Sequence, residues 1–251
     1  MKKLNKRVVK VANTLLEPLK HPTGAVLLAA GNSTRMGGSI NKQLYPLNGM
    51  PVLAHTLLAY QRCPLIREIV VVTRPQDFEA VFEIAKTYGI KKLKKITAGG
   101  KTRQESSKRG VDKLSADVEY VAIADGARCL TTPEQIAKVC LKAYRYKAAS
   151  AAHAATDSFK RATPSGIITQ PVDRTHLWAV QTPQIFHTAL YHAAYEAAAR
   201  DGAEVTDDNG LVERLGYRIR LVECGFENMK ITTPEDLKFA EAILQYREKN
   251  K

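Results

Sequence analysis

The 251-residue sequence has few aromatic residues and no long apolar run. Only 7% of its residues are aromatic while 45% are hydrophobic, so the chain can bury a sizeable core within one domain. No segment approaches the roughly 20 consecutive apolar residues that a membrane helix needs, and no signal-peptide pattern is visible. We therefore expect one α/β domain, located in the cytoplasm and without a membrane span.

Cysteine is also scarce, and its placement excludes two common kinds of site. The four cysteines form no CxxC pair and have no histidine at zinc-ligand spacing. A structural zinc or a disulfide framework is therefore not expected. We interpret the four as reduced thiols, mostly within the core: Cys63, Cys129, Cys140 and Cys224.

Acidic residues are outnumbered, with 25 Asp and Glu against 38 Lys and Arg, for a formal net charge of +13. Residues 1–20 carry six basic side chains and one acidic one, a net of +5, and their apolar residues have helical spacing. Such a field attracts nucleic acid, an anionic membrane surface or small polyanionic substrates. A nucleic-acid or membrane-surface binding protein is thus an alternative, although aromatic and basic residues are not interleaved.

From Gly24 onwards, short β-rich runs alternate with longer segments of helical period. This pattern predicts a Rossmann-like α/β fold, with a mainly parallel twisted sheet flanked by helices. Residues 156–181 break the alternation and predict a protruding β-hairpin arm. The expected strands are 24–29, 67–73, 93–97, 118–124, 148–155 and 217–223, and the expected helices are 51–62, 75–88, 102–113, 132–146, 184–200, 207–215 and 233–248.

The first predicted strand leads into a loop typical of phosphate binding. Residues 29–37 read AAGNSTRMG, and Lys42-Gln43 follow. Small residues let backbone N–H groups approach a triphosphate, while Arg35 and Lys42 can neutralise its charge. The segment is neither a Walker loop nor a GxGxxG motif. On composition alone, a simple turn with a solvated Lys42 explains it equally well.

Two further motifs follow later strands, where ligands of parallel sheets collect. Residues 98–106 read AGGKTRQES, which can be a ligand loop or a plain glycine turn with Arg103 as a surface charge. Asp125 ends an apolar strand and can ligate Mg²⁺ or accept a hydroxyl, with Arg128 available for phosphate. Alternatively, Asp125 starts a helix and pairs with Arg128.

Together these motifs resemble the 2-C-methyl-D-erythritol 4-phosphate cytidylyltransferases, a family of nucleotidyltransferases, over residues 24–247. The resemblance implies transfer of CMP from CTP to methylerythritol phosphate, with release of pyrophosphate, in non-mevalonate isoprenoid biosynthesis. It also implies Mg²⁺ as cofactor and a homodimer that exchanges arms. The nearest alternative is a ribitol 5-phosphate cytidylyltransferase of the same fold. Residues 1–23 would then form a basic extension and 24–251 a single nucleotidyltransferase domain.

The resemblance also implies roles for individual residues. The sequence departs from the family pattern at Ser33, Gly126, Cys129 and Ser158, which leaves the local loop and pocket shapes open. The implied catalytic residues are Arg35, Lys42 and Lys230; the implied CTP contacts are Ala29, Ala30, Gly31, Asn32, Gly100, Lys101, Ser106 and Asp125; the implied acceptor contacts are Asp125, Arg128, Ser158, Arg174, Thr182 and Lys230; and Asp125 is the implied Mg²⁺ ligand beside the CTP phosphates.

Overall fold

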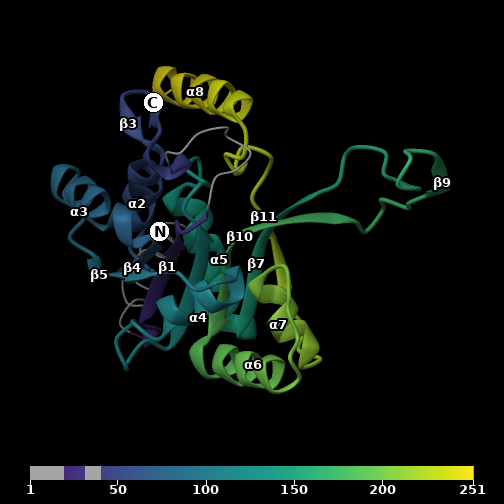
Figure 1. Ribbon diagram of the computed structural model, residues 1–251, viewed down its shortest axis with the longest axis horizontal. Helices are drawn as coiled ribbons and strands as arrows, with labels where there is room; N and C mark the ends of the chain where they lie inside the picture. Colours follow the sequence, from purple (N-terminus) through teal and green to yellow (C-terminus); the bar gives the residue numbers. More distant parts are fainter. Residues whose placement is uncertain (1–19, 32–40, 251) are drawn as a thin grey trace, which may run out of the picture.

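The computed structural model describes residues 20–31 and 41–250, so the N-terminal extension up to residue 19, Asn32 and Arg35 lie outside the described residues. The described chain forms a seven-stranded sheet in the order β11-β7-β10-β6-β1-β4-β5 (Figure 1). Every pairing is parallel except those of β10, which is antiparallel to β6 and β7. The strands are β1 (Thr23–Leu28), β4 (Ile66–Thr73), β5 (Leu93–Ala98), β6 (Tyr120–Asp125), β7 (Ala148–Ala154), β10 (Trp178–His187) and β11 (Arg220–Glu223).

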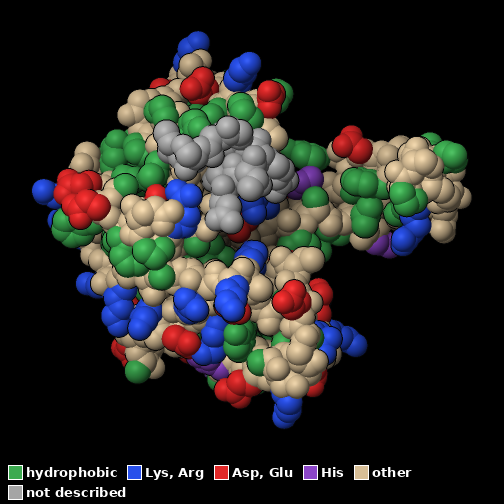
Figure 2. All heavy atoms as spheres, viewed as in Figure 1, with side chains coloured by type: hydrophobic (Ala, Val, Ile, Leu, Met, Phe, Trp, Pro, Cys, Tyr) green, Lys and Arg blue, Asp and Glu red, His purple; other side chains and the backbone are tan. Residues whose placement is uncertain are grey.

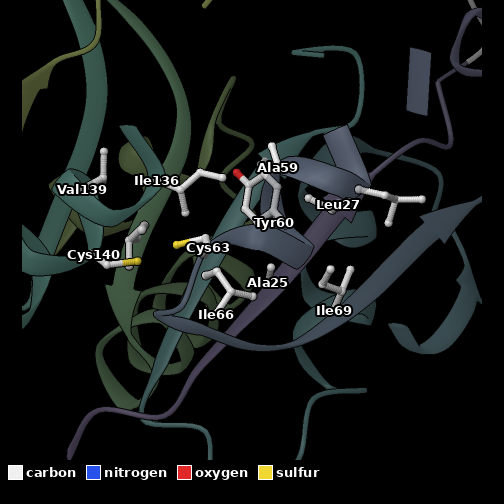
Figure 3. Packing of buried hydrophobic residues seen from close by; sticks show 14 of the residues in the cluster. Ala25, Leu27, Ala59, Tyr60, Cys63, Ile66, Ile69, Ile136, Val139 and Cys140 are labelled. Carbon is white, nitrogen blue, oxygen red and sulfur yellow. The ribbon is translucent and has the colours of Figure 1, made fainter. Parts of the chain in front are cut away.

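Helices cover both faces of the sheet because its central strands are apolar on both sides. In β1, Ala25 and Leu27 enter one core cluster whereas Val26 enters another, as the two-residue period of a strand requires. Figure 3 shows the first cluster, where Tyr60, Ile136 and Cys140 meet over the sheet. Its helices are α2 (Val52–Arg62), α3 (Phe78–Thr87) and α5 (Pro133–Tyr146), and those of the second are α4 (Arg103–Val111), α6 (Thr188–Arg200) and α7 (Asp208–Arg214).

Two helices begin with capping residues that satisfy the first free N–H groups. Thr132 caps α5: its Oγ1 accepts from the Gln135 N–H at 3.2 Å, and Gln135 Oε1 accepts from the Thr132 N–H at 2.9 Å. The last helix, α8 (Pro234–Lys249), begins after Thr233, whose N–H donates to Asp236 at 2.8 Å. Helices α5 and α8 also both have proline at their first position.

The predicted arm is present, but it is shorter than expected. A hairpin of β8 (Lys160–Ala162) and β9 (Ile168–Pro171) protrudes from the body (Figure 1). The chain re-enters the sheet at Trp178, so the prediction that a helix spans 184–200 is wrong in its first turn. Ile185 and Phe186 are fully buried in β10, and cross-strand pairing with β6 and β7 overrides the helical pattern there.

A short hairpin and two 3₁₀ turns were not predicted. The hairpin joins β2 (Pro46–Leu47) to β3 (Met50–Pro51) through Asn48-Gly49, whose φ angles of 48° and 73° are those that such a tight turn requires. The 3₁₀ turns are η2 (Lys42–Leu44) and η3 (Pro75–Asp77), and η3 replaces the first turn of the predicted helix 75–88.

The four cysteines are buried and free, as predicted. Burial raises the pKa of Cys224 to about 11 and that of Cys129 to about 12, so both thiols are uncharged at neutral pH. Within the described residues, no helix combines the length and apolar character needed to cross a membrane.

Candidate active site

A cavity of about 320 Å³ lies at the carboxyl ends of the central strands, between the loops that follow β1, β5 and β6. Its lining combines all three sequence motifs. Lys and Arg side chains gather over α4 on the face seen in Figure 2. The lining residues are Leu28, Ala30, Gly31, Lys42, Gln43, Gly100, Lys101, Thr102, Arg103, Ser106, Asp125, Ala127 and Lys230.

The first wall is formed by the residues that follow β1. The Ala29 N–H donates to the Val72 carbonyl at 2.7 Å, which extends the β1–β4 ladder by one residue. Asn41 then donates from Nδ2 to the Ala29 carbonyl and to Asp77 Oδ2, both at 2.9 Å. This buried amide ties the start of η2 to the end of β1, so Ala30, Gly31 and Lys42 face one cavity.

The second wall is the Gly99-Gly100 turn, which Ser106 supports. The Gly100 N–H donates to Ser106 Oγ at 3.0 Å, and that hydroxyl donates to the Thr102 carbonyl at 2.9 Å. A Cβ on Gly99 would lie 2.6 Å from the Ala30 Cβ, which is closer than van der Waals contact allows. Glycine is therefore required here for the two loops to approach each other.

Asp125, the last residue of β6, lies among three cations. Its carboxylate is 2.8 Å from Lys230 Nζ, 3.7 Å from Arg103 Nε and 3.8 Å from Arg128 Nε. Burial favours the neutral acid, but the Lys230 and Arg103 charges outweigh it and lower the pKa of Asp125 below its usual value. Asp125 is therefore ionised at neutral pH.

Thr182 and Arg128 form a layer behind Asp125 rather than part of the lining. Thr182 Oγ1 accepts from the Asp125 N–H at 3.0 Å, and Arg128 Nη1 donates to the Asn228 carbonyl at 2.6 Å. Asn228 Nδ2 in turn donates to the Thr182 carbonyl at 3.0 Å. These contacts fix the position of Asp125 from β10 and from the segment before α8.

Lys42 and Lys230 converge from distant parts of the chain. Lys42 Nζ donates to the Ile231 carbonyl at 2.7 Å, which places the two lysines beside each other at the cavity. Two of the three residues with implied catalytic roles therefore meet in one place, and the third, Arg35, lies outside the described residues.

Arg103 lines the cavity although it is not among the predicted site residues. Arg103 Nη1 donates to Asp208 Oδ2 at 2.6 Å while its Nε faces Asp125. Asp208 is fully buried at the start of α7, so Arg103 links that helix to the cavity. One indication in the sequence that Arg103 belongs to the site is its position in the first turn of the helix that follows Gly99-Gly100.

Ser158 and Arg174 lie near the base of the arm and do not line the cavity of their own chain. Arg174 Nη1 donates to the Thr156 carbonyl, and Asp173 Oδ1 accepts from the Thr175 N–H at 2.9 Å. Both predicted residues are exposed. Within one chain, Ser158 and Arg174 are therefore not part of the cavity that Asp125 and Lys230 line.

A sequence model of the family 2-C-methyl-D-erythritol 4-phosphate cytidylyltransferase matches residues 23–246. The chain belongs to this family. This confirms the predicted resemblance and the predicted class of enzyme, a nucleotidyltransferase.

Individual members of the family are similar over nearly their whole length. The enzyme of this name from Caldanaerobacter subterraneus subsp. tengcongensis is 44% identical over 223 residues, covering 88% of this chain and 98% of that one. That from Syntrophus aciditrophicus is 41% identical over 231 residues, covering 92% and 99%. The crystal structure of 4-diphosphocytidyl-2C-methyl-D-erythritol synthase from Anaerococcus prevotii has a TM-score of 0.78 at 29% identity, covering 89% and 98%. The predicted Rossmann-like fold is thereby confirmed.

The cavity is suited to Mg²⁺ only in the company of phosphates. Among the residues that the structure describes, no group of three or more His, Cys, Asp or Glu side chains is placed to hold a metal ion. Asp125 is the sole carboxylate among the lining residues described. Mg²⁺ in nucleotide enzymes is usually held by one or two carboxylates and substrate phosphates, which this donor set fits.

Proposed function

We propose that this enzyme transfers CMP from CTP to 2-C-methyl-D-erythritol 4-phosphate, forming CDP-methylerythritol and pyrophosphate. The observation that carries the proposal is the cavity that Lys42, Lys230 and Arg103 line together with a single ionised carboxylate, Asp125. Such a site attracts polyphosphates and holds them near a fixed anion. Membership of the family supports the choice of CTP and of this acceptor.

The reaction needs little covalent chemistry from the protein. An oxygen of the acceptor phosphate attacks the α-phosphorus of CTP; the new P–O bond forms as the bond to the β-phosphate oxygen breaks, and the electron pair leaves with pyrophosphate. Because a phosphate nucleophile is already ionised at neutral pH, no general base is required. Catalysis therefore depends on alignment and on stabilising negative charge.

Lys42 and Lys230 are the described residues that we assign to charge stabilisation. Lys42 is held by the Ile231 carbonyl, and Lys230 is held by Asp125. Both ammonium groups are thus oriented before substrate binds, so little reorganisation is needed as charge develops. Arg35, from the predicted phosphate loop, is proposed to act with them.

We assign the Gly100 turn, Lys101 and Ser106 to the cytosine ring, since they line the end of the cavity beyond β5. Mg²⁺ would be held by Asp125 together with CTP phosphates, where it would neutralise charge and orient the phosphates. Asp125 is also proposed to contact the acceptor, with Arg128 and Thr182 keeping it in place.

The proposal includes a homodimer in which each arm completes the partner's site with Ser158 and Arg174. The arm exposes Ile167 and Ile168, at 66% and 64% of their surface, which is unusual for a hairpin that stays in water. A second chain would cover this apolar surface and bring Arg174 to a cavity. A cytoplasmic location belongs to the same proposal and rests on the sequence.

A pyrophosphate-release assay with a panel of nucleotides and phosphopolyols tests the proposal. We expect CTP to exceed UTP and ATP, activity to be lost with EDTA and restored by Mg²⁺, and methylerythritol phosphate to exceed ribitol 5-phosphate by at least about tenfold. A preference for ribitol 5-phosphate would refute the acceptor assignment but leave cytidylyl transfer intact. Equal rates with ATP would refute the assignment of the base pocket.

A further inference from the structure

A second hollow, of about 380 Å³, lies between α3 and β5, the edge strand of the sheet. Figure 1 shows α3 beside this edge. None of its lining residues belongs to the candidate active site. The volume falls within the range of about 300–1,000 Å³ that is common for small-molecule sites.

The floor of this hollow is apolar, and a β-bulge helps to build it. Ile69 pairs with Leu93 whereas the next residue, Val70, pairs with Lys95, so Lys94 is an extra residue in β5. Residues three apart on a regular strand point to opposite faces. The bulge instead lets Leu93 and Ile96 pack against the same core cluster below α3, and bulges are a common device for redirecting side chains.

The rim combines an aromatic ring with basic side chains. Phe82 on α3 has 55% of its surface exposed, whereas Ile90 in the floor has 5%. Among the described residues, Lys86 has one ion-pair partner, Glu83, with 3.7 Å between Nζ and Oε1. Lys94 and Lys95 have no ion-pair partner within the part of the chain that the structure describes.

Lysines on an edge strand also discourage pairing with another strand. That role explains their presence on β5, but it does not explain the hollow beside them or the exposed ring of Phe82. An apolar floor bordered by lysines is complementary to a molecule with one apolar part and one anionic group.

We propose that the hollow between α3 and β5 binds a soluble anionic amphiphile, a small molecule with an apolar chain or ring and a phosphate or carboxylate group. A membrane surface fits less well, because insertion needs apolar side chains that project, and the floor residues Ala85 and Ile90 are recessed. The apolar part would cover Phe82 and Ile96, and the anionic group would lie towards the lysines that border the hollow.

Isothermal titration calorimetry with n-decyl phosphate tests the proposal. The full chain is saturated with CTP and Mg²⁺ beforehand, so that the residues assigned to the CTP phosphates are occupied. We expect one decyl phosphate per chain, and at least tenfold weaker binding of both inorganic phosphate and octyl glucoside, since each lacks one of the two required parts. The double substitution K94E/K95E should weaken decyl phosphate binding at least tenfold.

The matched control is K138E/K142E, which reverses two exposed lysine charges on α5 and should bind as the unmodified chain does. Phe82→Ser, measured together with thermal unfolding, serves as an independent variant and should weaken binding without loss of folding. Unchanged binding in both hollow variants, or equal weakening in the α5 control, would overturn the proposal. Binding to anionic lipid vesicles without any binding of monomeric decyl phosphate would instead favour a membrane-docking surface.

Discussion

The substitution Arg103→Ala tests the charge arrangement behind the candidate active site. Asp208 is fully buried, and among the described residues Arg103 is the one cation that forms an ion pair with it, at 2.6 Å. Burial raises the pKa of Asp208 above its usual value even though Arg103 opposes the shift. Removing one partner of a buried pair typically costs about 3–5 kcal/mol.

Proton uptake by Asp208 limits that cost. When Arg103 is removed, the buried carboxylate can take up a proton and become neutral. Its protonation costs about 1.36 kcal/mol for each pH unit above an unfolded-state pKa near 3.9. The loss of folding stability therefore cannot exceed about 4 kcal/mol at pH 7 or about 1.5 kcal/mol at pH 5. The sign follows from the raised native pKa: the folded state binds more protons, so stability falls as pH rises from the unfolded pKa to the folded one. We expect a loss of about 3 kcal/mol at pH 7, roughly 6–12 °C in Tm.

Urea unfolding at pH 7 and pH 5 measures both values. The matched control is Lys108→Ala on the same helix, because Lys108 also lies 2.6 Å from its partner, but Asp112 is exposed to solvent. That control should lose no more than about 0.5 kcal/mol at either pH. In an Asp208→Asn background, Arg103→Ala should cost less and lose the part of the pH dependence that comes from Asp208. The reasoning is refuted if the Arg103→Ala loss equals that of the control or does not shrink at pH 5.

Three further predictions follow from the site. Arg35→Ala and Lys42→Ala should each lower kcat/KM by about 10² or more with unchanged unfolding, measured by pyrophosphate release; near-normal turnover would remove the loop assignment. Gly126→Ala should lower Tm by about 2–4 °C, because its Cβ would lie 2.9 Å from Gln43 Oε1 and 3.2 Å from the Leu28 carbonyl oxygen, and Gln43→Ala should reduce that loss. Arg174→Ala should raise the KM for the acceptor more than that for CTP, and sedimentation should show a dimer; full activity as a nanomolar monomer would contradict the arm assignment.

The central strands could be predicted because a strand that is buried on both faces consists of apolar residues. The run Val70-Val71-Val72 is fully buried on both sides of β4, and only an apolar stretch can occupy such a place. β10 has no such apolar run, because its middle reads Gln181-Thr182-Pro183-Gln184. Its position depends on partners far along the chain.

Those partners explain why β10 could not be found locally. The Asn228 amide donates to Gln181 Oε1 at 3.0 Å, and the Asn209 N–H donates to Gln184 Oε1 at 3.0 Å. Buried amides are stable only when such bonds exist, and the sequence does not reveal which residues supply them. For the same reason the role of Arg103 could not be predicted, because its partner Asp208 is 105 residues away in the sequence.

The placement of charge says more about this enzyme than its total. The sequence carries +13, which alone is compatible with nucleic acid, a membrane or a nucleotide. Among the described residues, four basic side chains and one acidic one line the cavity, a net of +3; a carbonyl group holds Lys42, Asp125 holds Lys230 and Asp208 holds Arg103. Fixed charges in a recess favour a small polyanion, because a flexible or flat surface could not hold phosphates in line.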